Sequence, residues 1–246
     1  MSDPTLCDFL PWDTDHFGLR IGRVNRRHLT EASVQEIVEW QNSEAIECLY
    51  FLADFDDPET ARLAQAYNFQ LVDIRITLEW TSGRGQLARF DPDSQLTMRS
   101  FQPADIPILA EIARESHTDT RFFFDQNFPR DKSEALYEVW IRRSCEGLSD
   151  RVVTACVDGQ VAGYIVCKIL DDASGQIGLV GVAEQSRGKG VGKSLVNAAL
   201  DWFAGRNIRS VQVVTQGRNI AAQRLYQKCG FATRSVQLWY HRWASV

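Results

Sequence analysis

The sequence lacks paired cysteine motifs, and its first 95 residues contain no lysine. The six cysteines occur singly, without C-x-x-C or any other spacing of metal ligands, and most lie in apolar runs. Such cysteines are typical of reduced thiols in the core of a cytoplasmic protein, so we expect neither disulfides nor a metal site. No apolar stretch approaches the length of a membrane span, and four aspartates among the first 18 residues do not fit a signal peptide. We therefore expect a cytoplasmic protein without a membrane partner.

Charge is distributed unevenly along the 246 residues. Residues 1–95 contain 17 acidic and 8 basic side chains, whereas residues 96–246 contain 15 acidic and 19 basic ones. A basic second half predicts that an anionic ligand binds there. The excess is too small and too dispersed to indicate a nucleic-acid partner.

The two halves of the chain resemble each other. Turn-forming residues at 81–85 and 91–94 predict a linker, so we expect one domain over 1–93 and a second over 94–246. A shift of 162 residues aligns the halves without a gap and places the predicted strand 48–52 on 210–214. This match predicts an internal duplication. The first half lacks a glycine loop, and we expect it to be a degenerate scaffold on the acceptor side.

The second half predicts a mixed α/β arrangement. Strands are expected at 96–100, 152–157, 161–170, 177–182, 211–215 and 233–243, and helices at 103–115, 131–145, 193–204 and 220–228. Asp158-Gly159 predicts a tight hairpin, and Asp131 or Ser133 is the expected cap of the second helix. A hairpin leading into strand-helix-strand units is typical of a mixed α/β fold.

A glycine-rich loop joins the predicted strand 177–182 to the helix 193–204. It reads Arg187-Gly188-Lys189-Gly190-Val191-Gly192 and is followed by Lys193. Glycines at such a turn let the backbone approach a ligand, and they direct N–H groups and the helix dipole at an anion. We therefore expect residues 188–193 to bind phosphate groups.

Two common phosphate loops fit this segment poorly. The P-loop requires G-x-x-x-x-G-K-[ST], and Arg187 stands where its first glycine belongs. The dinucleotide pattern G-x-G-x-x-G is absent, because Gly188, Gly190 and Gly192 follow G-x-G-x-G. The spacing therefore disfavours a nucleoside triphosphatase and a dinucleotide-dependent enzyme.

The loop does resemble motif A of the GCN5-related N-acetyltransferases, [Q/R]-x-x-G-x-[G/A], at Arg187, Gly190 and Gly192. The segment from Asn219 to Phe231 is similar to the second signature of that family, N-x-x-A-x-x-x-Y-x-x-x-G-F, at every fixed position. The resemblance implies a GNAT fold in the second half, preceded by a degenerate GNAT-like half. It also implies acetyl-coenzyme A as cosubstrate, with its pyrophosphate on the glycine loop.

The same resemblance implies roles for single residues. The backbone of Val180, Gly181 and Val182 would pair with the pantetheine arm, and an N–H there would polarise the thioester carbonyl. Asn219 is either a helix cap or a cofactor contact. Tyr226 is the candidate general acid for the leaving thiolate, with a packing role as the alternative. No cysteine has a nucleophile context, so we expect the amine to attack directly in a ternary complex.

A second resemblance concerns the acceptor. The segment Thr120-Arg121-Phe122-Phe123-Phe124 crowds aromatic rings around one arginine, and Tyr137-x-x-Trp140-Ile141 follows it. Together with Trp12-Asp13-Thr14-Asp15-His16-Phe17-Gly18, these residues resemble the dTDP-fucosamine acetyltransferases. The resemblance implies a nucleotide-linked amino sugar as acceptor, with Arg121 and Phe122 as candidate binding residues. The three adjacent phenylalanines cannot all face a ligand. His117 is a candidate base, with packing as the alternative.

Other functions stay open on the sequence alone. The acceptor could be another amine, such as a protein N-terminus, a polyamine or an amino acid. A non-catalytic acyl-coenzyme A-binding module is a further alternative, against which the candidate acid Tyr226 argues. The last strand carries Trp239, Tyr240 and Trp243, and if it is exposed it could pair with a second copy to form a homodimer.

Overall fold

The computed structural model describes residues 5–82 and 96–244, which fold around one ten-stranded mixed sheet. The strands are β1 (Cys7–Phe9), β2 (Ile21–Val24), β3 (Cys48–Asp54), β4 (Gln70–Thr81), β5 (Leu96–Ser100), β6 (Arg151–Val157), β7 (Gln160–Ile169), β8 (Ser174–Val182), β9 (Ser210–Gln216) and β10 (Ala232–Trp243). The helices are α1 (Pro11–Phe17), α2 (Glu31–Ser43), α3 (Pro58–Ala66), α4 (Ile106–Ser116), α5 (Arg121–Phe124), α6 (Arg130–Arg143), α7 (Val191–Ala204) and α8 (Ile220–Lys228). Among the described residues, no helix has the length and apolar character needed to cross a bilayer.

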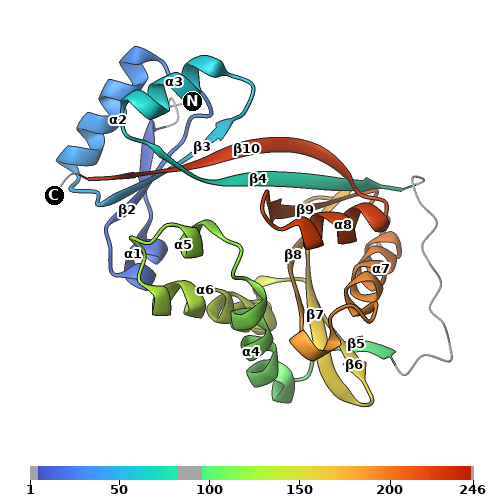
Figure 1. Cartoon of the computed structure of the whole chain (residues 1–246). Helices are drawn as coiled ribbons and strands as arrows, with labels where there is room; N and C mark the ends of the chain where they lie inside the picture. The colour runs from blue at the N-terminus through green and yellow to red at the C-terminus, as the bar shows by residue number, and fades with distance from the viewer. Residues whose placement is uncertain (1–4, 83–95, 245–246) are drawn as a thin grey trace.

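The strand order is β1-β2-β3-β10-β4-β9-β8-β7-β6-β5. Two pairs of neighbours, β2 with β3 and β8 with β9, are parallel, and the other pairs are antiparallel. Figure 1 shows the long strands β4 and β10 running side by side across the middle of the molecule. The C-terminal strand is therefore in the interior of the sheet.

Helices cover both faces of this sheet. Along β3, Leu49 and Phe51 join the apolar cluster under α2 and α3, whereas Tyr50 joins the cluster under α1, α4, α5 and α6. Along β7, Ile165 joins a third cluster, which lies under α7 and α8, and Tyr164 joins the α4–α6 cluster. Because successive strand residues point to opposite faces, α2, α3, α7 and α8 share one face and α4–α6 cover the other.

The internal repeat has a geometric counterpart. The unit β3-α3-β4 begins at residue 48 and ends at residue 81, and the unit β9-α8-β10 begins at 210 and ends at 243, with every element bound shifted by 162. The pairing of β10 with β3 has the same register as the pairing of β4 with β9. Gln237 faces Asp54 in the first pair, and their counterparts in the repeat, Arg75 and Gln216, face each other in the second. The two units are thus related by a local twofold axis between β4 and β10. The expected boundary between residues 93 and 94 lies outside the described residues.

Two expectations about single elements are wrong. The last strand is not an exposed edge, because β3 and β4 occupy both of its sides, and it therefore offers no free edge to a second copy. Neither Asp131 nor Ser133 caps α6, whose first turn follows Pro129. Ser133 is instead buried, and its hydroxyl donates to the carbonyl of Phe122 at 3.0 Å.

Candidate functional site

A gap opens in the sheet between β8 and β9. Their parallel pairing ends at Ile177 opposite Val213. The next residues of β8 form a bulge. Ile177 and Val180 of β8 pair with Cys167 and Ile165 of β7, so the two β8 residues between them lie opposite the single residue Val166. A bulge bends the strand that carries it, so β8 leaves β9 while β9 stays paired with β4. The backbone of residues 214–216 is left without a strand partner on the side of β8.

A cavity of about 580 Å³ lies at this gap. Its walls come from both halves of the chain, including residues 23–27 at the end of β2 and after it, Leu52 of β3, Asp73 and Arg75 of β4, Trp239 of β10, residues 178–180 of β8 and residues 214–216 of β9. The α4–α6 segment and α8 supply the remaining lining residues, which are Ser116, His117, Thr120, Arg121, Phe122, Tyr137, Trp140, Asn219, Ala222 and Tyr226. One chamber thus connects the strand gap with the N-terminal half.

The glycine loop ends in an open helix N-terminus. Gly190 is the N-cap of α7 with a φ of 83°, and no side chain caps the helix. The N–H of Ser194 makes the first helical hydrogen bond, to the carbonyl of Gly190 at 3.1 Å, so the N–H groups of residues 191–193 have no acceptor in the helix. Gly188 also has a positive φ, of 76°. This geometry suits an anion, and it lies outside the cavity lining, beyond the end of β8.

Tyr226 and Asn219 both lie on the cavity wall. Tyr226 is 5% exposed, and burial raises the pKa of its hydroxyl, which keeps the group protonated at neutral pH. In the part of the chain that the structure describes, this hydroxyl has no hydrogen-bond partner and its ring packs near Phe231. The side chain of Asn219 accepts from the N–H of Ala222 at 2.9 Å, so it caps α8 while it lines the cavity.

Only one of the three expected β8 contacts lines the cavity. Val180 does, whereas Gly181 and Val182 lie next to it in the strand, outside the lining. A Cβ at Gly181 would come within 2.5 Å of the ring of Tyr164, so packing against β7 requires this glycine. The carbonyl of Val182 accepts from Nε of Arg187 at 3.2 Å, which ties the first residue of the glycine loop to β8.

Arg121 is held in an aromatic cage on the cavity wall. Its guanidinium lies 4.3 Å from the ring centre of Tyr50, 4.0 Å from that of Phe122 and 4.3 Å from that of Trp239. Its Nη1 lies 3.4 Å from Nε2 of His241. Stacking of this kind fixes the plane of a guanidinium and leaves its edge free for a ligand.

A buried pair behind Arg121 fixes this arrangement. Nδ1 of His241 lies 2.7 Å from the carboxylate of Asp125, and burial lowers the pKa of His241 to about 4. Burial opposes the ionisation of Asp125, but hydrogen bonds from His241 and Trp243 keep the pKa of its carboxyl below the usual value. The neutral ring therefore donates from Nδ1 and presents the lone pair of Nε2 to Arg121. No sequence motif indicated this pair, because its members are 116 residues apart.

The three adjacent phenylalanines divide their roles as expected. Phe122 is 5% exposed and packs in the core while it borders the cavity, whereas Phe124 is 58% exposed. The guanidinium of Arg218 stacks on Phe124 at 4.0 Å. Phe122 is therefore the member of this run that can contact a ligand in the cavity.

Two further titratable groups, His117 and Asp73, line the cavity. Nε2 of His117 lies 3.1 Å from the hydroxyl of Tyr164, its ring stacks on Tyr137, and burial lowers its pKa to about 4. Burial raises the pKa of Asp73 to about 6, while the charge of Arg218 opposes the rise. The sequence reading did not single out Asp73. In the described lining it is the one carboxylate among five arginines, which are Arg23, Arg26, Arg27, Arg75 and Arg121.

A parted strand pair and a buried tyrosine on one cavity, with an uncapped helix N-terminus beyond the end of β8, are the features expected of the acetyltransferase family that the sequence resembles. Sequence comparison agrees, because the acetyltransferase (GNAT) family matches residues 109–231, and the chain belongs to that family. The fold agrees over nearly the whole chain. A GCN5-related N-acetyltransferase from Sphaerobacter thermophilus superposes with a TM-score of 0.68 at 17% identity, covering 98% of this chain and 77% of that one.

The curated relatives that match the chain are named for different processes and activities. The chain is 29% identical to the spore coat polysaccharide biosynthesis protein SpsD of Bacillus subtilis, matching 58% of this chain and 49% of that protein. It is 29% identical to the dTDP-fucosamine acetyltransferase of Escherichia coli, over 57% of this chain and 61% of that one. It is 28% identical to the mycothiol acetyltransferase of Stackebrandtia nassauensis, over 86% of this chain and 69% of that one. The matches to the first two therefore cover less than two thirds of those relatives.

Proposed function

We propose that this enzyme transfers the acetyl group of acetyl-coenzyme A to the primary amine of a nucleotide-linked amino-deoxy sugar. The observation that carries the proposal is the single cavity joining the β8–β9 gap and Tyr226 to Arg121 and the arginines of the N-terminal half. A donor and a charged acceptor can thus meet in one chamber. The six cysteines are free in the structure, which fits a reducing, cytoplasmic setting.

The donor end of the site suits acetyl-coenzyme A. The N–H groups of residues 188–193 and the dipole of α7 would hold the pyrophosphate, with Arg187 and Lys189 at the side. The pantetheine arm is a chain of amides, and the unpaired backbone of β8 and β9 offers it the hydrogen bonds of an added strand. Val180 lies on the cavity, so its backbone and those of Gly181 and Val182 would place the thioester there.

The chemical step is direct attack by the amine. The free amine forms a bond to the thioester carbonyl carbon, and a backbone N–H near Val182 would meet the charge on the oxygen. The carbon–sulfur bond then breaks, and Tyr226 donates its proton to the departing thiolate. Tyr226 carries its proton until that moment, since a tyrosine is protonated at neutral pH and burial raises the pKa of this one further. The proton lost by the amine leaves through Asp73 or through water in the cavity.

The acceptor end of the site favours an anionic molecule. Five arginines and one aspartate line the cavity, a balance that disfavours a polyamine because it would repel cationic groups. Arg121 presents a planar fork suited to phosphate or to several hydroxyl groups, and the ring of Phe122 gives it an apolar neighbour. The dTDP-fucosamine acetyltransferase among the relatives supports a sugar nucleotide.

The test is a thiol-release assay with acetyl-coenzyme A and a panel of amines. The panel contains dTDP-linked amino-deoxy sugars, the same sugars without the nucleotide, polyamines, amino acids and a peptide with a free N-terminus. We expect the nucleotide-linked sugars to give kcat/KM at least ~10³-fold above the other amines, because loss of buried charge pairing discriminates strongly. Equal rates for the free sugars would contradict a nucleotide-binding acceptor site.

A further inference from the structure

Four arginines from the N-terminal half line the cavity. Arg23, Arg26 and Arg27 follow or end β2, and Arg75 comes from β4. The segment 1–95 contains 8 basic residues, all arginine, against 17 acidic ones. Half of the basic residues of an acidic segment thus line one chamber, and each of them is an arginine, whose fork pairs with phosphate oxygens in a bidentate manner.

The positive charge of this cluster is poorly compensated. Nη1 of Arg75 donates to the amide oxygen of Gln237 at 3.1 Å, and among the described residues no carboxylate pairs with it. Burial lowers the pKa of Arg75, and the charges of Arg27 and Arg121 lower it further. Arg26 is exposed and has no ion-pair partner in the described ranges. Among the described residues, Arg23 is the one of the four that forms an ion pair, with Asp8 at 3.1 Å.

The position of the cluster follows from the internal twofold. In the second half, the glycine loop and α7 connect the parallel strands β8 and β9. In the first half, parallel strands β2 and β3 are arranged in the same way, and residues 25–30 lead from β2 into α2. The loop that carries Arg26 and Arg27 is thus the counterpart of the glycine loop.

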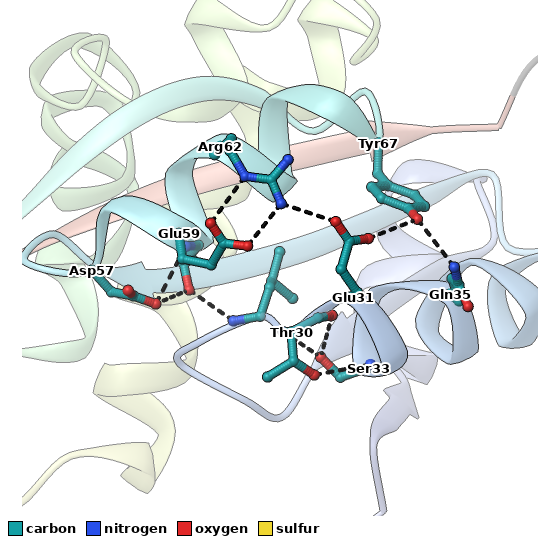
Figure 2. A network of polar contacts seen from close by, with 10 residues as sticks. Thr30, Glu31, Ser33, Gln35, Asp57, Glu59, Arg62 and Tyr67 are labelled. Carbon is teal, nitrogen blue, oxygen red and sulfur yellow. Dashed lines mark hydrogen bonds and ion pairs between the residues drawn. The ribbon is translucent and has the colours of Figure 1, made fainter.

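The two loops differ in the way their helices begin. Thr30 caps α2 and forms a reciprocal capping box with Ser33, as Figure 2 shows. The same view shows Glu31 of α2 in contact with Arg62 and Tyr67, so the start of this helix is tied to α3 and its neighbours. The N-terminus of α2 therefore has its own acceptors, and arginine side chains remain as the anion donors of this loop.

We propose that Arg23, Arg26, Arg27 and Arg75 form a second anion site, which binds the phosphate groups of the acceptor. This inference rests on the proposed function, because it names the residues that bind the acceptor's diphosphate. The acceptor then enters from the N-terminal half and the donor from the glycine loop, and the two meet near Tyr226. The degenerate half keeps the anion-binding position of its counterpart and replaces backbone N–H groups with guanidinium groups.

Two molecules could supply the phosphate groups that these arginines bind. One source is the acceptor's diphosphate, and the other is the pyrophosphate of coenzyme A. The probe is therefore thymidine diphosphate, titrated by calorimetry into the full chain with and without saturating coenzyme A. We expect binding in both conditions. Loss of binding when coenzyme A is present would assign the cluster to the donor and overturn the proposal. Thymidine without phosphate is the negative probe, and we expect it to bind at least ~10-fold more weakly.

Variants separate the cluster from general charge effects. Arg75→Gln should weaken thymidine diphosphate at least ~10-fold, the loss typical of a charge-assisted hydrogen bond. Arg26 is exposed on a loop, so its replacement should not disturb the core. Arg26→Gln should therefore give a smaller loss of affinity for thymidine diphosphate. Arg209→Gln is the matched control, since Arg209 is exposed and lies outside the cavity lining. Equal affinities in all three variants would overturn the anion site.

The two proposals can fail separately. If no amino sugar is acetylated while thymidine diphosphate binding depends on Arg75 and Arg26, the proposed acceptor is wrong and the anion site stands. If nucleotide-linked sugars are acetylated and neither variant changes their KM or the affinity for thymidine diphosphate, the acceptor is right and the anion site is wrong.

Discussion

Arg75 and Gln237 are joined by a hydrogen bond of 3.1 Å, and they are also each other's counterparts in the internal repeat, 162 residues apart. They face each other in the β4–β10 pair, so the local twofold passes between them. A local twofold axis would allow two identical residues to pair at this point. Here Arg75 borders the cavity, and the side-chain amide of Gln237 donates a hydrogen bond to Asp54 at 2.8 Å. The two related units thus differ at their centre, where Arg75 contributes charge to the cavity and Gln237 supports it.

Replacing Tyr226 by phenylalanine tests the general acid. The change removes one hydroxyl that has no described partner, so the fold should keep its stability while kcat falls about 10²-fold or more. The dissociation constant of acetyl-coenzyme A should change less than about twofold. Tyr67→Phe is the control, because Tyr67 lies on the surface network of α2 and α3 and should leave kcat unchanged. Unchanged turnover in the first variant would remove Tyr226 from the mechanism.

Gly190→Val tests the donor loop. Gly190 caps α7 with a φ of 83°, and a branched side chain there strains the turn and blocks the approach of a pyrophosphate. We expect acetyl-coenzyme A binding to be lost in a calorimetric titration. Gly159→Val carries a comparable strain, because its φ is 77°, yet it lies in the β6–β7 hairpin and should bind acetyl-coenzyme A normally. Retained binding in the Gly190 variant would place the pyrophosphate elsewhere.

Arg121→Lys tests the acceptor contact. Lysine keeps the charge but loses the planar fork that stacks between Tyr50 and Trp239. The acceptor KM should rise about tenfold, while the KM of acetyl-coenzyme A stays within about twofold. Steady-state kinetics with each substrate varied in turn separates the two effects. A rise in both constants would indicate a general disturbance of the cavity.

His241 makes stability depend on pH. Its folded pKa is about 4 against 6.5 in the unfolded chain, so below pH 6.5 the unfolded state binds a proton that the folded state excludes. The free energy of unfolding should therefore fall by about 1 kcal/mol between pH 7 and 5.5 from this group. Denaturant titrations of His241→Gln should show a smaller slope over that interval. His28→Gln, at an exposed position, should retain the slope of the parent.

Asp73 makes catalysis depend on pH in the same direction, since activity also falls as pH falls. Burial raises the pKa of its carboxyl to about 6, so the group becomes an anion, able to accept a proton, only as pH rises through that value. We expect kcat/KM for the acceptor to rise across pH 5 to 7, which gives the pH profile an acidic limb. This limb should disappear in Asp73→Asn. Asp119→Asn, a nearby exposed change, should keep the limb. A limb that survives in the Asp73 variant would assign the titration to another group.

Local patterns predicted the elements of the second half closely. The expected strand at 96–100 and the helix at 220–228 have the bounds of β5 and α8, and the Asp158-Gly159 turn joins β6 to β7 with both residues at positive φ. These elements depend on alternation, capping and turn chemistry, which act over a few residues. The cofactor loop was predicted for the same reason, because its glycines and flanking elements are contiguous.

Long-range pairing could not be predicted from the sequence. Alternating apolar residues in 233–243 are equally compatible with an edge strand and with a central one, and only the neighbours β3 and β4 decide between them. Several charged residues of the cavity lining were missed for a related reason. Arg26, Arg75 and Asp73 come from separate elements and share no motif, although alignment of Arg75 with Gln237 in the repeat was a signal that could have marked the centre of the molecule.

The placement of β10 also governs the order in which the chain can fold. Gln41 and Arg242, 201 residues apart, are joined by two hydrogen bonds that link α2 to β10. A nascent chain that has not yet released β10 from the ribosome leaves facing edges of β3 and β4 open, so its first half cannot close early as an independent unit. Closure of the sheet between β3 and β4 therefore waits for β10, and contacts of such high sequence separation make that step slow.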